Sequence, residues 1–280
     1  MTEMYRVSKI LNNNGVIAID MDENKEYVIL GKGVGFGKKV SQRFDKPEGC
    51  TTYRLEQETE RGSAKELVKG IEPEYLEIAD AILTESQKVF GDSIDRGILF
   101  PLADHISFAV ARIRRNEQIS NPLTEDIKVL FYSEFKVAET LKTILRERLQ
   151  IEIDDHEVGY VALHIHSAIG DEKVSVAMQI ARAVRECIDM IEKATGKPID
   201  ILSLSYNRLM NHMKYMVVRA STGEKLNLDM NEYMLDQYPQ AYKVATDICK
   251  NLEGCIGHKL DETETGYLAM HIQRVYKDAV

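Results

Sequence analysis

Two stretches, Glu157–Ala168 (EVGYVALHIHSA) and Glu264–Val275 (ETGYLAMHIQRV), decide how this chain is organised. They share Glu, Gly, Tyr, Ala, His and Ile at matching positions, so one offset, the separation of Glu157 from Glu264, relates them. The same offset aligns Leu102–His105 (LADH) with Leu209–His212 (LMNH). A fixed period of this length indicates a tandem pair of domains rather than a short-repeat solenoid.

Each copy carries two histidines with the same spacing, His105 and His164 in the first and His212 and His271 in the second. A neutral imidazole is a nucleophile and changes its charge near pH 7. Four histidines on a repeated grid therefore predict a repeated chemical role. The alternative is that both copies inherited core histidines from one ancestral domain.

Composition sets limits on the class of protein. The chain has 280 residues with 44% hydrophobic content, which fits one to three soluble domains. No stretch approaches the roughly 20 apolar residues of a membrane span, and the N-terminus lacks the apolar region of a signal peptide. We therefore expect a cytoplasmic protein with no membrane insertion.

The cysteines give no sign of a disulfide framework or a metal site. Cys50, Cys187, Cys249 and Cys255 form no CxxC pair, so reduced structural thiols are expected. Cys249 and Cys255 with His258 match no standard zinc spacing. We predict no metal and no other cofactor.

Charge is unevenly distributed along the chain. Residues 1–55 hold nine Lys or Arg and seven Asp or Glu, whereas the remainder holds 27 and 38. An acidic chain is a poor nonspecific binder of nucleic acid. A small basic segment on an acidic body directs attention to residues 1–55 as a binding domain.

This N-terminal segment is predicted to be an antiparallel β domain. Turn residues at 12–15 and 22–25 separate short apolar runs. The expected strands are Val7–Leu11, Val16–Ile19, Glu26–Leu30 and Thr51–Leu55. So small a sheet buries little surface, and we therefore expect it to dimerise.

The loop Gly31–Lys39 (GKGVGFGKK) admits three interpretations. The first is a nucleotide-binding loop, but the stretch lacks the Walker spacing and the GxGxxG pattern of such loops. The second is a flexible hairpin. The third is a nucleic-acid surface, in which Lys9, Lys32, Lys38 and Lys39 contact phosphates, asparagines read base edges and Phe36 stacks on an unpaired base. That combination suits RNA loops better than duplex DNA.

The rest of the chain shows apolar residues at helical spacing. Asp154-x-x-Glu157 and Asp261-x-x-Glu264 predict capping boxes. A polar linker at 57–62 and a seam at 170–172 divide the chain into domains at 1–60, 65–170 and 171–280. The fold class is therefore multidomain α+β, a small antiparallel β domain followed by two tandem all-α bundles. The expected helices are Ser63–Asp92, Arg96–Arg115, Asp126–Arg148, Glu157–Ile169, Val174–Ala194, Ser203–Ala220, Pro239–Leu252 and Glu264–Lys277.

An enzyme is the rival class, for example a histidine- or metal-dependent phosphohydrolase. The sequence offers no HExxH motif, carboxylate cluster or nucleophile–base–oxyanion set to accompany the histidines. His156, His166 and His258 have no counterpart in the other copy, and we assign them to ordinary packing. We therefore expect a regulator and not an enzyme.

The chain resembles the BglG/SacY-type transcriptional antiterminators of bacteria over essentially its whole length. Residues 9–14 (KILNNN) with 30–36 (LGKGVGF) look like the RNA-binding co-antiterminator domain. The motifs LADH and ALHI look like one phosphotransferase-regulation (PRD) domain, and NH with AMHI looks like a second. GKGVGFGKK and ALHIHSA are most similar to the glucose-type subgroup.

The resemblance implies a sugar-controlled RNA switch. A dimeric β domain would bind a hairpin in a nascent leader transcript, exclude an overlapping terminator and so allow transcription of a sugar-uptake operon. RNA contact is carried onto Lys9, Asn14, Gly31, Lys32 and Phe36, with lysine at 32 where some relatives have arginine. DNA-binding relatives carry an N-terminal helix-turn-helix, which the predicted strands argue against.

The resemblance also implies that His105, His164, His212 and His271 carry phosphoryl groups. The donors would be the phosphocarrier protein and a sugar-specific enzyme II of the phosphotransferase system. Asp104 is expected to orient His105, whereas the second copy has Asn211 at that place. Phosphorylation of the first helical domain is expected to disfavour the RNA-competent homodimer.

Overall fold

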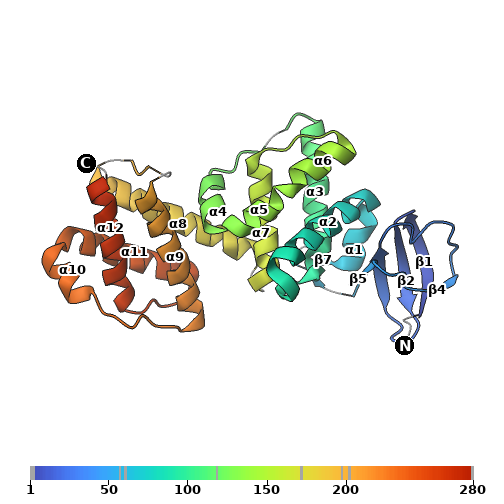
Figure 1. Cartoon of the computed structure of the whole chain (residues 1–280), viewed down its shortest axis with the longest axis horizontal. Helices are drawn as coiled ribbons and strands as arrows, with labels where there is room; N and C mark the ends of the chain where they lie inside the picture. Colours follow the sequence, from blue (N-terminus) through green and yellow to red (C-terminus); the bar gives the residue numbers. More distant parts are fainter. Residues whose placement is uncertain are drawn as a thin grey trace. The chain divides into compact units, whose positions relative to one another are not determined.

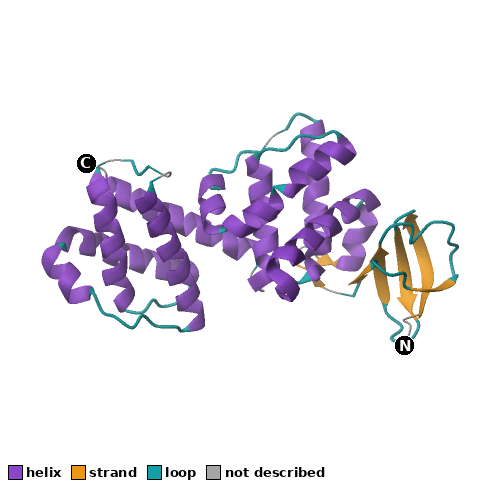
Figure 2. Ribbon diagram, in the orientation of Figure 1, coloured by secondary structure: helices purple, strands orange, loops and turns teal. Residues whose placement is uncertain are grey.

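The computed structural model describes residues 4–56, 58–59, 62–117, 119–170, 173–196, 198–200 and 203–278. Contacts divide the chain into two compact units (Figures 1 and 2). The first unit comprises residues 1–121 and 133–174, and the second comprises 122–132 and 175–280. Parts of the predicted linker and seam, namely Gln57, Glu60, Arg61, Asp171 and Glu172, lie outside the described residues.

The first unit begins with a five-stranded antiparallel sheet of strand order β4-β1-β2-β3-β5. The four predicted strands are confirmed, and β4 is an addition that pairs with β1. A three-residue strand is too short for periodicity to reveal, and β4 is held by Phe44, whose ring packs near Tyr5. The strands are β1 (Met4–Asn12), β2 (Gly15–Asp20), β3 (Glu26–Leu30), β4 (Arg43–Asp45) and β5 (Thr51–Arg54).

One face of this sheet forms a small apolar core. Alternate residues of a strand point to the same face, so Tyr5 and Val7 of β1 meet Val16 and Ala18 of β2. Val34, from the loop after β3, is also buried in this cluster. The loop Gly31–Lys39 therefore packs against the sheet and contributes to its core.

The helices of the first unit follow a two-stranded ladder of β6 (Glu58–Thr59) and β7 (Gly62–Ser63). The predicted helix Ser63–Asp92 is two helices, because Pro73 cannot continue a helix from the preceding turn and instead begins α2. The elements are α1 (Ala64–Gly70), α2 (Pro73–Phe90), η1 (Gly91–Ser93), η2 (Arg96–Ile98), α3 (Leu99–Arg114), α5 (Tyr132–Ala138), α6 (Thr140–Leu149) and α7 (Asp155–Gly170).

The second unit takes in a helix from the sequence of the first copy. The predicted helix Asp126–Arg148 is three helices, and the first of them, α4 (Thr124–Leu130), packs against α9. The hydroxyl of Tyr206 donates to Asp126 Oδ1 at 3.2 Å there, and burial raises the pKa of both groups. The other helices are α8 (Val174–Thr195), α9 (Leu204–Thr222), α10 (Asn231–Gln237), α11 (Pro239–Ile256) and α12 (Thr263–Asp278).

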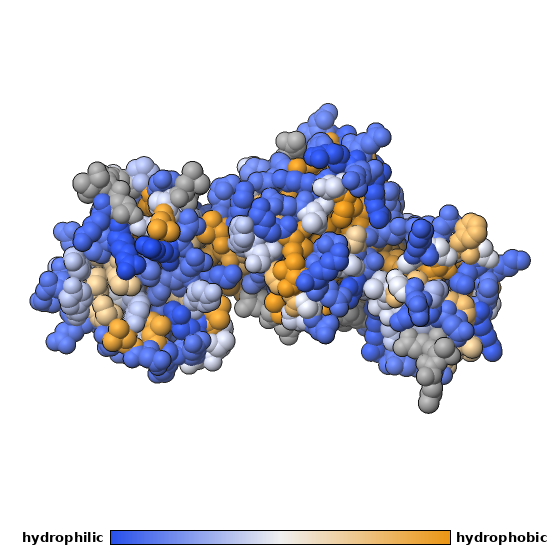
Figure 3. Space-filling model, viewed as in Figure 1, coloured by the Kyte–Doolittle hydropathy of each residue, from blue (hydrophilic) through white to orange (hydrophobic). Residues whose placement is uncertain are grey.

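Short elements account for most differences from the predicted helices. The sequence did not predict α10, which lies between α9 and α11 and buries Met234. Hydrophilic side chains dominate the face shown in Figure 3, with apolar ones showing between them. Among the described residues, none of the helices has both the length and the apolar character that crossing a membrane requires.

Candidate functional site

The four repeated histidines form two pairs, one in each unit. His105 on α3 and His164 on α7 have ring centroids 5.4 Å apart. His212 on α9 and His271 on α12 have ring centroids 4.8 Å apart and are nearly stacked. Residues that are distant in sequence thus become neighbours twice, in equivalent places on equivalent helices.

A buried glutamate, paired with a half-buried arginine, lies beside each histidine pair. In the first unit, Arg112 Nη2 donates to Glu157 Oε1 at 2.8 Å, and His105 Nε2 lies 3.4 Å from Glu157 Oε2. Burial raises the pKa of Glu157, but His105 and Arg112 outweigh it and hold that pKa below its ordinary value.

The second unit repeats this arrangement with better hydrogen bonds. Arg219 donates from Nε and Nη2 to the two oxygens of Glu264 at 2.6 and 2.9 Å. His212 Nε2 lies 3.6 Å from Glu264 Oε2. Arg112 and Arg219 are related by the same offset as the histidines, so the repeat period itself could have identified them.

The sequence pattern predicts that both glutamates belong to capping boxes, and the structure confirms half of that prediction. Asp154 Oδ1 accepts from the backbone N–H of Glu157 at 3.2 Å, as an N-cap should. The Glu157 carboxylate, however, binds Arg112 instead of returning to the start of its own helix. Glu264 likewise binds Arg219, while Asp261 accepts from the N–H of Thr263.

Electrostatics keep the second pair uncharged at neutral pH. Burial, together with His271 and Arg219, lowers the pKa of His212 to about 3. Burial, together with Arg274 and Arg208, lowers the pKa of His271 to about 4. Both imidazoles are therefore neutral at pH 7, the form in which a ring nitrogen has a lone pair for nucleophilic attack.

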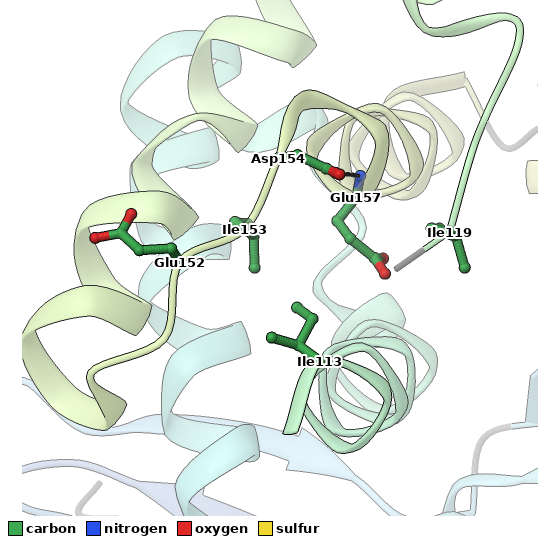
Figure 4. Close-up of a pocket in the computed structure, with 6 residues that line it drawn as sticks. All are labelled: Ile113, Ile119, Glu152, Ile153, Asp154 and Glu157. Atoms are coloured by element: carbon green, nitrogen blue, oxygen red, sulfur yellow. Dashed lines mark hydrogen bonds between the residues drawn. The ribbon is translucent and has the colours of Figure 1, made fainter. Parts of the chain in front are cut away.

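A small cavity adjoins Glu157 in the first unit (Figure 4). Its volume of about 10 Å³ gives room for about one water, and Ile113, Ile119 and Ile153 help to line it. The equivalent cavity beside Glu264 has a volume of about 220 Å³. It is lined by Ala220 and Lys259, at the positions of Ile113 and Glu152 in the first copy.

An exposed aromatic side chain lies almost one helical turn after the first histidine of each pair. Phe108 is 58% exposed after His105, and Tyr215 is 59% exposed after His212. Phe108 and Tyr215 occupy equivalent positions in the two copies. Residues three apart on a helix lie on neighbouring parts of its surface, so each histidine pair adjoins an exposed aromatic group.

The histidines without a counterpart make local contacts. His166 Nδ1 lies 2.9 Å from Glu134 Oε1, and His156 Nδ1 contacts the backbone of Asn121. His258 is exposed beyond the end of α11. Asp104 is half-buried beside His105, and its orienting role stays a prediction. Within the described ranges, no three potential metal-ligating side chains cluster together.

The predicted RNA-contact residues of the loop and the β1–β2 turn come together in the first unit. The N–H groups of Gly31 and Gly33 donate to the backbone oxygen and to Oδ1 of Asn14, at 2.9 and 3.0 Å. The N–H of Gly35 donates to the Asn13 oxygen at 2.9 Å. These bonds hold the Gly31–Lys39 loop on the β1–β2 turn.

The anchored loop leaves Lys32 and Phe36 open to a ligand, whereas the Lys38 ammonium lies 4.5 Å from the centroid of the Phe44 ring. Phe36 is 74% exposed, and Lys32 and Lys9 are also exposed. Gly31 packs tightly, because a Cβ there would lie 2.3 Å from Cys50 Sγ. At Gly35 a Cβ would lie 2.1 Å from the backbone oxygen of Asn12. Glycine at these positions is thus required by close packing.

Helix α2 contacts the asparagines of the β1–β2 turn. Asn12 Nδ2 donates to Glu77 Oε1 at 2.7 Å, and Asn14 Nδ2 donates to Glu77 Oε2 at 3.1 Å. One turn further along α2, Asp80 accepts from the hydroxyls of Thr51 and Tyr53 and from Arg96. The amide of Asn14, a predicted RNA-contact residue, is therefore already engaged within the chain.

Comparison with known proteins matches both parts of this arrangement. The CAT RNA binding domain family matches residues 5–62, and the PRD domain family matches residues 80–168 and 185–275. The chain belongs to the transcription antiterminators that join a CAT RNA-binding domain to two PRD domains. The predicted resemblance and the predicted fold class are both confirmed.

Similar proteins extend over nearly the whole chain. The GlcA/glcB genes antiterminator of Staphylococcus carnosus is 30% identical over 274 residues, which cover 96% of this chain and 94% of the relative. Protein GlcT of Staphylococcus haemolyticus is 29% identical over 96% of this chain and 95% of its own length. Transcription antiterminator LicT of Bacillus subtilis is 27% identical over 98% of this chain and all of its own length.

A solved structure resembles part of the chain. The crystal structure of GlcT CAT-PRDI superposes with a TM-score of 0.52 and 28% identity. The match covers 60% of the present chain and 99% of the chain in the GlcT CAT-PRDI crystal structure.

Proposed function

We propose that this antiterminator binds, as a homodimer, an RNA hairpin in the leader transcript of a sugar-uptake operon. The observation that carries the proposal is the Gly31–Lys39 loop, which hydrogen bonds hold on Asn13 and Asn14. The loop presents both a cation, Lys32, and an aromatic ring, Phe36, as exposed side chains. An aromatic ring and a cation on an anchored loop suit an RNA loop with an unstacked base.

The four paired histidines are the proposed phosphoryl acceptors of this switch. Their donors are the phosphocarrier protein and a sugar-specific enzyme II, and a glucose permease fits the likeness to relatives named GlcT. His212 and His271 are neutral at pH 7, as an accepting imidazole must be. The histidines accept a group rather than catalyse turnover, and the protein acts in the cytoplasm, where its transcript is made.

Dimerisation is the proposed link between the histidines and the RNA. The exposed aromatics Phe108 and Tyr215 adjoin the two histidine pairs and provide apolar surface for an isologous contact. A phosphoryl group adds a charge of about −1.5 to −2 at such an interface. A change of only a few kcal/mol in the free-energy difference between the two states is enough to shift a dimer equilibrium, and repulsion at the interface supplies such a change. Phosphorylation of the first pair then disfavours RNA binding.

The contact between Asn14 and Glu77 gives a second level of control within the first unit. The Asn14 side-chain NH2 group has two protons, and one of them is donated to Glu77. An RNA base that takes this proton must displace Glu77, and in that geometry helix α2 competes with RNA for Asn14.

A binding and readthrough assay tests the proposal. The full chain is mixed with leader RNA from upstream of the neighbouring sugar-transport operon, and gel shift and transcriptional readthrough are measured. Phe36→Ala should weaken both signals, as expected for the loss of about 1–3 kcal/mol of base stacking. Val40→Ala removes another exposed apolar side chain close to the same loop, 61% exposed, and should leave them unchanged. Equal behaviour of the two variants would argue against RNA recognition by this loop.

A further inference from the structure

The two histidine pairs differ in the charges around them. In the second unit, Arg208 precedes His212 by one turn of α9, and Arg274 follows His271 by almost one turn of α12. The equivalent positions in the first copy are Pro101 and Ser167. The first copy instead has Asp104 where the second has Asn211. Compared with the first copy, the second therefore has two additional positive charges and one fewer negative charge near its histidine pair.

Helix geometry places these arginines around the second pair. Side chains three or four residues apart lie on the same face of a helix, so Arg208 lies beside His212 and Arg274 beside His271. The two histidine rings are 4.8 Å apart, which brings the two helix faces together. Both arginines contribute to the lowered pKa of His271, so their positive charges act on its ring.

Arg208 and Arg274 are available to a ligand. Both are exposed, and neither forms an ion pair with a carboxylate in the part of the chain that the structure describes. Arg219 is different, because both of its hydrogen bonds go to Glu264. The second pair therefore has two uncommitted guanidinium groups, each able to donate paired hydrogen bonds to phosphate oxygens.

The buried nitrogens indicate which ring atom meets the donor. Nδ1 of His271 is buried without a hydrogen-bond partner in the described structure, which leaves Nε2 to face outward. In His212 it is Nε2 that is buried, beside Glu264. Attack on a phosphoryl donor is therefore open to Nε2 of His271.

We propose that Arg208 and Arg274 form a binding site for the phosphoryl group carried on Nε2 of His271. This inference rests on the proposed function, in which His271 is a phosphoryl acceptor. In the transfer, the lone pair of Nε2 forms a new N–P bond while the N–P bond of the donor breaks. Its electron pair returns to the donor imidazole, and each ring keeps the proton on its other nitrogen.

The consequence is a difference in how the two units hold the same chemical group. A phosphoryl dianion on His271 meets two arginines, whereas one on His105 or His164 lies near Asp104 and a single arginine, Arg112, already bound to Glu157. The second unit accommodates the charge within itself. The first unit has no comparable free cations at the equivalent positions and transmits the charge as repulsion.

The test measures phosphoryl occupancy on the full chain. The protein is equilibrated with phosphorylated phosphocarrier protein, and occupancy of each histidine is read by mass spectrometry and ³¹P NMR. Arg208→Ala/Arg274→Ala should lower the ratio of phosphorylated to free His271 about tenfold. Occupancy of His105 and His164 should not change. Lys250→Ala, at an exposed lysine on α11, should match the parent.

The outcomes separate this inference from the function on which it rests. If His271 accepts phosphate in the parent and equally well in the double alanine variant, the arginine site is refuted and the acceptor role stands. If His271 accepts nothing from a donor that phosphorylates its own enzyme II, both are refuted. Because both arginines are exposed, thermal melts should match. Should the alanine variant unfold, Arg208→Lys/Arg274→Lys keeps the charge without the paired donors and should show an intermediate occupancy.

Discussion

Replacing Arg219 by methionine is expected to destabilise the second unit strongly, because it leaves the Glu264 carboxylate buried without its cation. Glu264 is 1% exposed, and both of its oxygens accept from Arg219. Breaking a buried ion pair from one side costs about 3–5 kcal/mol, since the remaining charge keeps its desolvation penalty. For a unit of this size, the apparent Tm should fall by roughly 10 °C or more.

The chain contains a control pair with the same bond lengths in a different environment. Arg146 donates to Glu152 at 2.6 and 2.9 Å, the distances found for Arg219 and Glu264. The control side chains are 59% and 67% exposed. Exposed ion pairs contribute little to stability, so Arg146→Met should change the melting curve very little. The difference between the two variants measures the effect of burial.

Denaturant titrations of the full chain, with and without the companion change Glu264→Gln, provide the assay. The double variant has no buried charge, so it should recover much of the loss caused by Arg219→Met alone. The deficit of the single variant should also shrink in acid, because a protonated carboxyl needs no cationic partner. A loss no larger than that of Arg146→Met, or a deficit independent of pH, would refute the reasoning.

Three further outcomes are expected. Phe36→Ala should weaken RNA binding by about 1–3 kcal/mol in a gel shift, yet leave Tm unchanged because the ring is 74% exposed; a matching fall in Tm would mean a structural role. His212 and His271, with pKa values lowered to about 3 and 4, bind protons more readily when unfolded. Stability should therefore fall by roughly 1–2 kcal/mol per histidine between pH 7 and 5, and a His212→Gln/His271→Gln variant that keeps the full slope would contradict this. Glu77→Ala frees the amide of Asn14 and should raise the RNA affinity of the full chain several-fold, and unchanged affinity in filter binding would exclude competition by α2.

The histidine pairs could be predicted because the chain contains two copies of one domain, and the copies can be aligned with each other. One constant offset marks His105 with His212 and His164 with His271 without any other protein. The long strands and helices were also predictable, since alternation or helical spacing continues over many residues. For example, β3 was predicted at Glu26–Leu30 and begins and ends there.

The elements that were missed depend on contacts distant in sequence. The strand β4 and helix α10 have three and seven residues, and each is fixed by one buried side chain, Phe44 or Met234. The sequence did not reveal that the Glu157 side chain binds Arg112, because the same residue also fits a capping box. Extending the comparison of the two copies to Arg112 and Arg219 would have revealed it.

Helix α4 has a consequence for anyone who cuts or recombines this gene. The repeat period places residues 122–132 in the first copy, yet they pack in the second unit, where Asp126 accepts from Tyr206. A fragment that starts at the repeat junction near residue 171 would lose α4, and the buried Tyr206 hydroxyl would lose its hydrogen-bond acceptor Asp126. If the second domain of another protein were grafted at that junction, it would have to pack against an α4 whose sequence fits the α9 of this chain. The exchangeable module is therefore discontinuous, and an autonomous second half needs the 122–132 segment supplied with it.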